Sequence, residues 1–165
     1  MATAVPPGAS LEVSLPQGTV RYSDQGAGPT LVFVHGLLAN HLLWSPVIPP
    51  LISHFRCIAP DIPLGAHSHP FPPDADLSPL GIARLIADFL EALDLQEVTL
   101  IGNDTGGAMC QLVDDPFFSQ RLARRPQQAF PDARLYFLSH CRAFVPLDQP
   151  EVFARHITEF VYAQV

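Results

Sequence analysis

Residues 98–112, VTLIGNDTGGAMCQL, constrain the fold of this chain more than any other stretch. The run VTLI ends at Gly102, a charged Asp104 follows at once, and an apolar pattern with helical spacing begins after two glycines. An apolar run without alternation is typical of a strand that is buried on both faces of a parallel sheet. A strand, a glycine-rich turn and a helix in this order predict an α/β fold with Asp104 at the tip of the turn.

The rest of the chain repeats this alternation of strands and helices. A mostly parallel, doubly wound sheet of about six strands is therefore predicted, with an antiparallel N-terminal hairpin, in a single domain over residues 1–165. Ser78 as N-cap and Pro79 at the first position predict the clearest helix, and Asp148 with Glu151 predicts a capping box for the last one. The expected strands are 11–15, 19–23, 30–36, 55–61, 98–102 and 133–139, and the other expected helices are a proline-broken one at 44–52 and those near 106–113 and 118–125.

Composition limits the classes of function that this chain can have. The 165 residues are 48% hydrophobic and carry a net charge of −7, which indicates a globular domain and argues against nucleic acid as a partner. The chain has neither a run long enough to span a membrane nor an N-terminal secretion signal, so a cytoplasmic protein is expected. Cys57, Cys110 and Cys141 lack metal-site or disulfide spacing, and neither a metal nor a cofactor is expected.

The turn from Gly102 to Gly106 has the small–x–nucleophile–x–small pattern of a nucleophile elbow. Its central residue, Asp104, would stand at a helix N-terminus, where free N–H groups and a partial positive charge favour an anion. A helix-capping aspartate, or a glycine turn of the phosphate-binding type, remains the alternative for this segment. His35 and Gly36 end another buried strand, and His35 by itself is read either as a structural residue or as part of the site.

These motifs resemble those of the α/β-hydrolase fold. The resemblance rests on LVFVHG, RCIAPDIPLGAHS and DLSPLGIARLIADFLEALDLQEVTLIGNDTGGAMCQL, and also on PDARLYFLSHCRAFVPLDQPEVFARHITEFV. It is to the branch with an aspartate nucleophile, which contains haloalkane dehalogenases and epoxide hydrolases. It implies that Asp104 attacks carbon to form an ester, that a histidine activates water, and that a second carboxylate orients the histidine. It also implies that the backbone N–H groups of Leu37 and Thr105 bind the oxyanion, and that Leu37, Leu38 and Trp44 line a pocket, with a core position as the alternative for Trp44.

Parts of the family pattern have no counterpart in this sequence. The cap domain, one core strand and most of the acid-bearing strand are missing, with an apparent internal deletion near 112–114. Asp115 matches the position of the acid, with a loop or N-cap aspartate as the alternative. Ala143 stands at the position of the histidine base. His140 is the first candidate to replace that base, and His67 and His69 are the next.

Two functions follow from these patterns. The first is a hydrolase that acts through Asp104 on a small haloalkane, epoxide or ester, with efficient turnover not expected because alanine cannot deprotonate water. The second is a non-catalytic, shortened scaffold that binds a ligand or a partner. In either case the apolar surface left without a cap favours a homo-oligomer, and no membrane association is expected.

Overall fold

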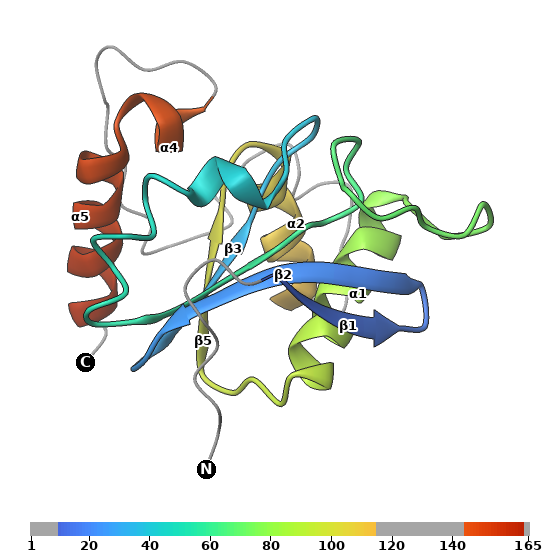
Figure 1. The fold of residues 1–165 in the computed structure, drawn as a ribbon, viewed down its shortest axis with the longest axis horizontal. Helices are drawn as coiled ribbons and strands as arrows, with labels where there is room; N and C mark the ends of the chain where they lie inside the picture. The colour runs from blue at the N-terminus through green and yellow to red at the C-terminus, as the bar shows by residue number, and fades with distance from the viewer. Residues whose placement is uncertain (1–9, 115–143, 164–165) are drawn as a thin grey trace.

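The computed structural model describes residues 10–114 and 144–163, which form one five-stranded sheet with helices on both faces (Figure 1). The strands are β1 (Leu11–Leu15), β2 (Gly18–Gly26), β3 (Thr30–Val34), β4 (Arg56–Pro60) and β5 (Val98–Gly102). The helices are the 3₁₀ helix η1 (His41–Trp44) and the α-helices α1 (Pro79–Ala92), α2 (Thr105–Asp114), α4 (Val145–Asp148) and α5 (Pro150–Tyr162). None of the described helices is long and apolar enough to cross a membrane.

The sheet has the order β1-β2-β4-β3-β5. β3 pairs in parallel with β4 and with β5, whereas β2 pairs antiparallel with β1 and with β4. This confirms the predicted parallel centre and the N-terminal hairpin. Because β3, β4 and β5 run in the same direction, the residues that follow them meet at one edge of the sheet, where α/β folds place their ligands.

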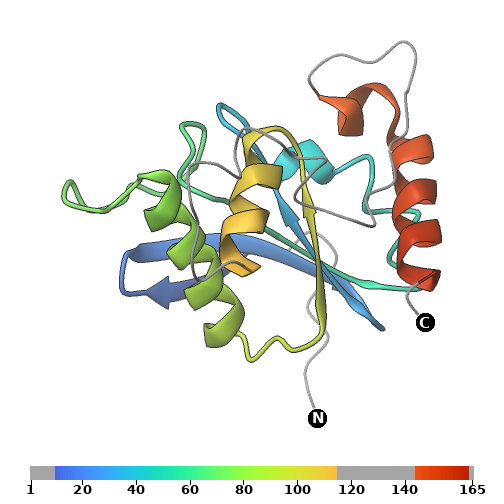
Figure 2. The same ribbon diagram turned by 180° about the vertical axis from the view of Figure 1, so that it is seen from behind.

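Both faces of β3 are buried, which explains its uninterrupted apolar sequence. Val32 and Val34 belong to the core beneath α1 and α2, and Leu31 and Phe33 belong to the core beneath η1 and α5. The two views of the ribbon show these helix layers on opposite faces of the sheet (Figures 1 and 2). The alternation of side chains along a strand thus divides β3 between two cores.

The helix α1 begins as predicted. The Ser78 hydroxyl accepts a hydrogen bond from the Gly81 amide at 3.1 Å, and Pro79 occupies the first position. The predicted capping box of α5 is wrong. Gln149 is the N-cap of α5 and makes no side-chain cap hydrogen bond, while Asp148 is the last residue of α4. The Asp148 amide donates to the Phe144 carbonyl at 3.1 Å, so Asp148 has helical pairing that an N-cap residue lacks.

The prediction of a helix over residues 44–52 is also wrong. The regular helix in this region is η1, which ends at Trp44, and turns follow it. Isolated helical hydrogen bonds remain, from the Ile48 amide to the Trp44 carbonyl at 3.0 Å and from the Ile52 amide to the Ile48 carbonyl at 3.2 Å. The prolines at 46, 49 and 50 have no N–H to donate, so these bonds do not join into a continuous helix. The predicted strand 133–139 and helix near 118–125 lie outside the described residues.

Candidate active site

Asp104 lies at the turn between β5 and α2 in the left-handed backbone conformation, with φ of 53°. This conformation is uncommon for residues other than glycine, although aspartate tolerates it better than most. The turn is closed by hydrogen bonds from the Gly106 amide to the Asn103 carbonyl at 2.9 Å and from the Gly107 amide to the Asp104 carbonyl at 3.0 Å. The Asp104 side chain is exposed. A strained turn thus presents one carboxylate at the N-terminus of a helix.

Two glycines allow this turn to approach the end of β3. A Cβ atom on Gly36 would lie 2.8 Å from Oδ2 of Asp104, which is closer than real contacts permit. A Cβ atom on Gly106 would overlap with the Val34 carbonyl oxygen. Only glycine fits at either position while the backbone stays in place, because each position faces another segment at contact distance. The Asp104 carboxylate therefore lies directly against the backbone that follows β3.

The loop after Gly36 is tied to the elbow through a side chain. The Leu37 amide donates a hydrogen bond to Oγ1 of Thr105 at 2.8 Å. The amide that the resemblance assigns to an oxyanion is therefore already paired in this structure. The next residue, Leu38, has φ of 58° and a side chain that is 74% exposed, and its amide donates to the Leu64 carbonyl at 2.9 Å. A bulky residue in this conformation indicates local strain of the kind found at ligand sites.

His35 is completely buried, and both of its ring nitrogens are engaged. Its Nε2 accepts a hydrogen bond from the Ile62 amide at 2.9 Å, and its Nδ1 lies 2.9 Å from the Gly36 carbonyl oxygen. These partners require the tautomer with hydrogen on Nδ1. Burial lowers the pKa of His35, which favours this neutral form. The geometry corresponds to the structural alternative for His35: the ring joins the loops after β3 and β4.

A buried carboxylate, Asp61, lies beside His35 and was missed by sequence reasoning. Its Oδ2 accepts hydrogen bonds from the Ser68 amide at 2.9 Å and the Ser68 hydroxyl at 2.7 Å. Its Oδ1 lies 3.6 Å from Nδ1 of His41 and 4.0 Å from Nε2 of His35. Burial opposes ionisation, but the contacts with His41 and Ser68 outweigh it and hold the pKa of Asp61 below its usual range. The available signal was its position, because Asp61 follows β4 directly.

No described contact joins His67 or His69 to Asp104. His69 Nε2 lies 3.5 Å from Oε1 of Glu12, and the His67 ring packs edge-on against Phe71. Asp115, His140 and Ala143 lie outside the described residues. Within the described part of the chain, no group of three or more histidine, cysteine or acidic side chains could hold a metal ion.

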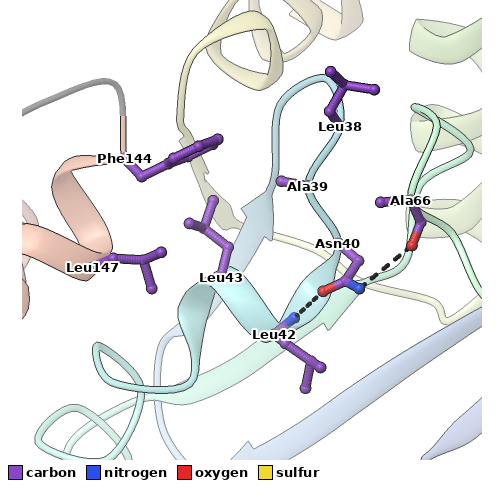
Figure 3. Close-up of a pocket in the computed structure, with 8 residues that line it drawn as sticks. All are labelled: Leu38, Ala39, Asn40, Leu42, Leu43, Ala66, Phe144 and Leu147. Carbon is purple, nitrogen blue, oxygen red and sulfur yellow. Dashed lines mark hydrogen bonds between the residues drawn. The ribbon is translucent and has the colours of Figure 1, made fainter.

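An apolar groove of about 310 Å³ opens beside the loop that carries Leu38 and Ala39 (Figure 3). The Asn40 side chain fixes one wall, because its oxygen accepts from the Leu42 amide at 3.0 Å and its nitrogen donates to the Ala66 carbonyl at 3.4 Å. The groove is lined by Leu38, Ala39, Asn40, Leu42, Leu43, Ala66, Phe144 and Leu147.

Trp44 does not line this groove. It has no exposed surface, and its ring centre lies 5.2 Å from that of Phe33 and 6.1 Å from that of Phe153. Trp44 is therefore a core residue, the alternative that the sequence left open. Leu37, the other predicted pocket residue beside Leu38, is 51% exposed and is not among the residues that line the groove.

The sequence of this chain is similar to those of two haloalkane dehalogenases. Among curated relatives, a haloalkane dehalogenase from Mesorhizobium japonicum is 32% identical over 128 residues, which are 77% of this chain and 38% of that protein. Haloalkane dehalogenase 2 from Mycobacterium tuberculosis is 32% identical over 97 residues, covering 59% and 34% of the two chains. This chain therefore spans less than half the length of these relatives.

Solved structures show the same fold. The epoxide hydrolase CorEH superimposes with a TM-score of 0.57 and 26% identity over 64% of this chain and 36% of that chain. A bacterial membrane phospholipase A gives a TM-score of 0.58 with 27% identity over 73% and 36% of the two chains. The family model for the alpha/beta hydrolase fold matches residues 29–113, a segment that runs from β3 to α2 and contains Gly36, Asp61 and Asp104. Since this segment is just over half of the 165 residues, the chain belongs to the α/β-hydrolase fold family.

Proposed function

We propose that this chain acts as a hydrolase whose nucleophile is Asp104, and that it forms an alkyl-enzyme ester with a small haloalkane, epoxide or ester. The observation that carries the proposal is the strained turn, which holds an exposed carboxylate against Gly36 and beside the Leu37–Thr105 pair. Strained backbone at the tip of a strand-to-helix turn is typical of nucleophile elbows. The haloalkane dehalogenase relatives support the same chemistry.

The first half-reaction needs no base. An oxygen of the Asp104 carboxylate forms a bond to the substrate carbon, and the bond from that carbon to the leaving group breaks with its electron pair. The N-terminus of α2 carries the partial positive charge of the helix dipole, which favours the ionised carboxylate of Asp104. The leaving group is a halide, a ring oxygen or a carboxylate, according to the substrate.

The apolar groove supports a substrate with a short hydrocarbon arm. Leu38 and Ala39 come from the loop next to the elbow, and Phe144 and Leu147 come from the segment around α4 (Figure 3). Its volume of about 310 Å³ is at the lower end of the range for small-molecule pockets. It is open on one side, so it would orient such an arm without enclosing the substrate.

The second half-reaction needs a base to deprotonate water. The family motif places that base at the position of Ala143, and alanine has no group that can accept a proton. Loss of a positioned general base typically lowers the rate by about 10² to 10⁴. We therefore infer that the ester forms readily and is hydrolysed slowly, with His140 as the first candidate for a substitute base and Asp115 for its orienting acid.

A non-catalytic scaffold is the second candidate function. It is favoured by Ala143, which stands at the position of the base. A turnover assay on 1-bromobutane and 1,2-epoxybutane, with Asp104→Ala as control, separates the two. The hydrolase proposal expects slow product release that disappears in Asp104→Ala. Equal rates for both proteins would support the scaffold instead.

A further inference from the structure

The hydrogen bond between Leu37 and Thr105 joins two turns that are 68 residues apart in the sequence. We propose that the Thr105 hydroxyl, and not the Leu37 amide, donates the hydrogen bond to the substrate, and that the site consequently prefers an oxygen leaving group, such as the ring oxygen of an epoxide, to a halide. This inference rests on the proposed function, because it concerns the leaving group of the reaction at Asp104.

The hydrogen-bond inventory of the hydroxyl leads to this assignment. A threonine hydroxyl has one hydrogen to donate and two lone pairs that accept. The Leu37 N–H occupies one lone pair at 2.8 Å, and no described residue accepts the hydroxyl hydrogen. Thr105 is only partly buried and directly follows Asp104. The hydrogen is therefore available to a ligand that approaches the nucleophile.

The pair also makes the hydroxyl a better donor than the amide. To bind the substrate itself, the Leu37 N–H would first have to lose its existing partner, which costs the hydrogen bond and leaves the hydroxyl oxygen without it. If the pair stays intact, the N–H polarises the hydroxyl, and a hydroxyl that accepts one hydrogen bond donates the next one more strongly. The Leu37 amide then acts through Thr105.

The leaving group decides how much this donor matters. When the Asp104 oxygen attacks an epoxide carbon, a new C–O bond forms and the ring C–O bond breaks, with its electron pair going to the ring oxygen. That oxygen becomes an alkoxide, a strong base, which is stabilised by the hydroxyl and then takes a proton from solvent water at the exposed site. A departing bromide is a very weak base and gains little from the same donor. A neutral hydroxyl therefore discriminates between the two classes.

The test compares single-turnover labelling of Asp104 by 1,2-epoxybutane and by 1-bromobutane, which share a four-carbon chain. Wild type, Thr105→Val and Thr105→Ser are followed by intact mass spectrometry. Thr105→Val keeps the shape and loses the donor, and we expect it to slow the epoxide reaction by about 10²-fold, the usual effect of removing one such donor. Its reaction with 1-bromobutane should change by no more than about threefold, and Thr105→Ser should stay near wild type with both probes.

Each outcome separates the inference from the proposed function. Suppose that wild type is labelled, and that Thr105→Val slows labelling by both probes equally or by neither. This result overturns the inference and leaves Asp104 as the nucleophile. If wild type gives neither an adduct nor a product with either probe, both the inference and the proposed function are overturned. If Thr105→Val does not fold, as judged by circular dichroism, Thr105→Ala is the second hydroxyl-free variant and is held to the same expectation.

Discussion

Replacement of Gly36 by alanine should disable the site with little change elsewhere in the fold. The new Cβ atom would lie 2.8 Å from Oδ2 of Asp104 and 2.9 Å from the Asn103 carbonyl oxygen. Carbon–oxygen contacts this short are not tolerated, so either the Asp104 carboxylate or the turn must move. The carboxylate is exposed and can rotate, whereas the Asn103 carbonyl belongs to the backbone that opens α2. The substitution therefore displaces the nucleophile and strains the elbow.

The size of the effect follows from these contacts. Overpacking of a tightly fitted position typically costs about 1–3 kcal/mol of unfolding free energy. For a chain of this length that corresponds to a fall in Tm of roughly 2–12 °C, at about 2–4 °C for each kcal/mol. Displacement of a reacting group by about 1 Å lowers rates by about 10²-fold. We therefore expect Gly36→Ala to remain folded below its transition and to label Asp104 with 1-bromobutane about a hundredfold more slowly than wild type.

Gly107→Ala is the matched control. A Cβ atom on Gly107 would have its nearest neighbours, in Gly102, at 3.9 Å, which is an ordinary contact. Since Gly107 is within α2, alanine there should be neutral or stabilise the protein by up to about 1 kcal/mol and leave labelling unchanged. Thermal melts and labelling rates of the three proteins check this. If Gly36→Ala has the same labelling rate and the same Tm as wild type, the close approach of the elbow to β3 is refuted.

Three further outcomes are expected. Ser78→Ala removes the cap of α1 and should lower the unfolding free energy by about 1 kcal/mol in urea melts, with Ser53→Ala, at an exposed turn, as the unaffected control. The pKa of Asp61 is lower in the folded chain than in the unfolded chain, so its ionised form stabilises the fold, and this stabilisation is lost as the pH falls. The difference in unfolding free energy between wild type and Asp61→Asn should therefore shrink below about pH 5. A difference that stays constant with pH would contradict this. Burial raises the pKa of the Cys57 thiol to about 12, so iodoacetamide at pH 8 should leave Cys57 unmodified in the folded protein, as peptide mapping can verify.

Local sequence signals predicted most of the described fold. The apolar run at β3, the cap at Ser78 and the glycine-rich turn at Asp104 each act within a few residues, so a single sequence reveals them. The helix expected over 44–52 and the cap expected from Asp148 failed for a different reason. At both places prolines interrupt the helical hydrogen bonds, and a short separate helical turn lies next to them. The spacing of residues in the sequence does not show at which turn the helix begins.

The turn that carries Asp104 was predicted, but the contacts around it were not. Asp104 lies at the expected turn, yet the pairing of Leu37 with Thr105 depends on how closely two distant loops approach each other. Burial of Asp61 beside His35 and His41 likewise follows from the parallel pairing of β3 with β4, which no short motif contains. Trp44 could have faced either a pocket or the core, and only the packing against Phe33 and Phe153 decides.

Intact mass spectrometry after incubation with 1-bromobutane tests the central claim most directly. The claim is that Asp104 is alkylated and that the resulting ester persists because the position of the base is occupied by Ala143. We predict one stable adduct on wild type, mapped to Asp104, none on Asp104→Ala, and a shorter-lived adduct on Ala143→His. An adduct that remains on Asp104→Ala, or wild type that turns over rapidly without accumulating any adduct, would contradict the account.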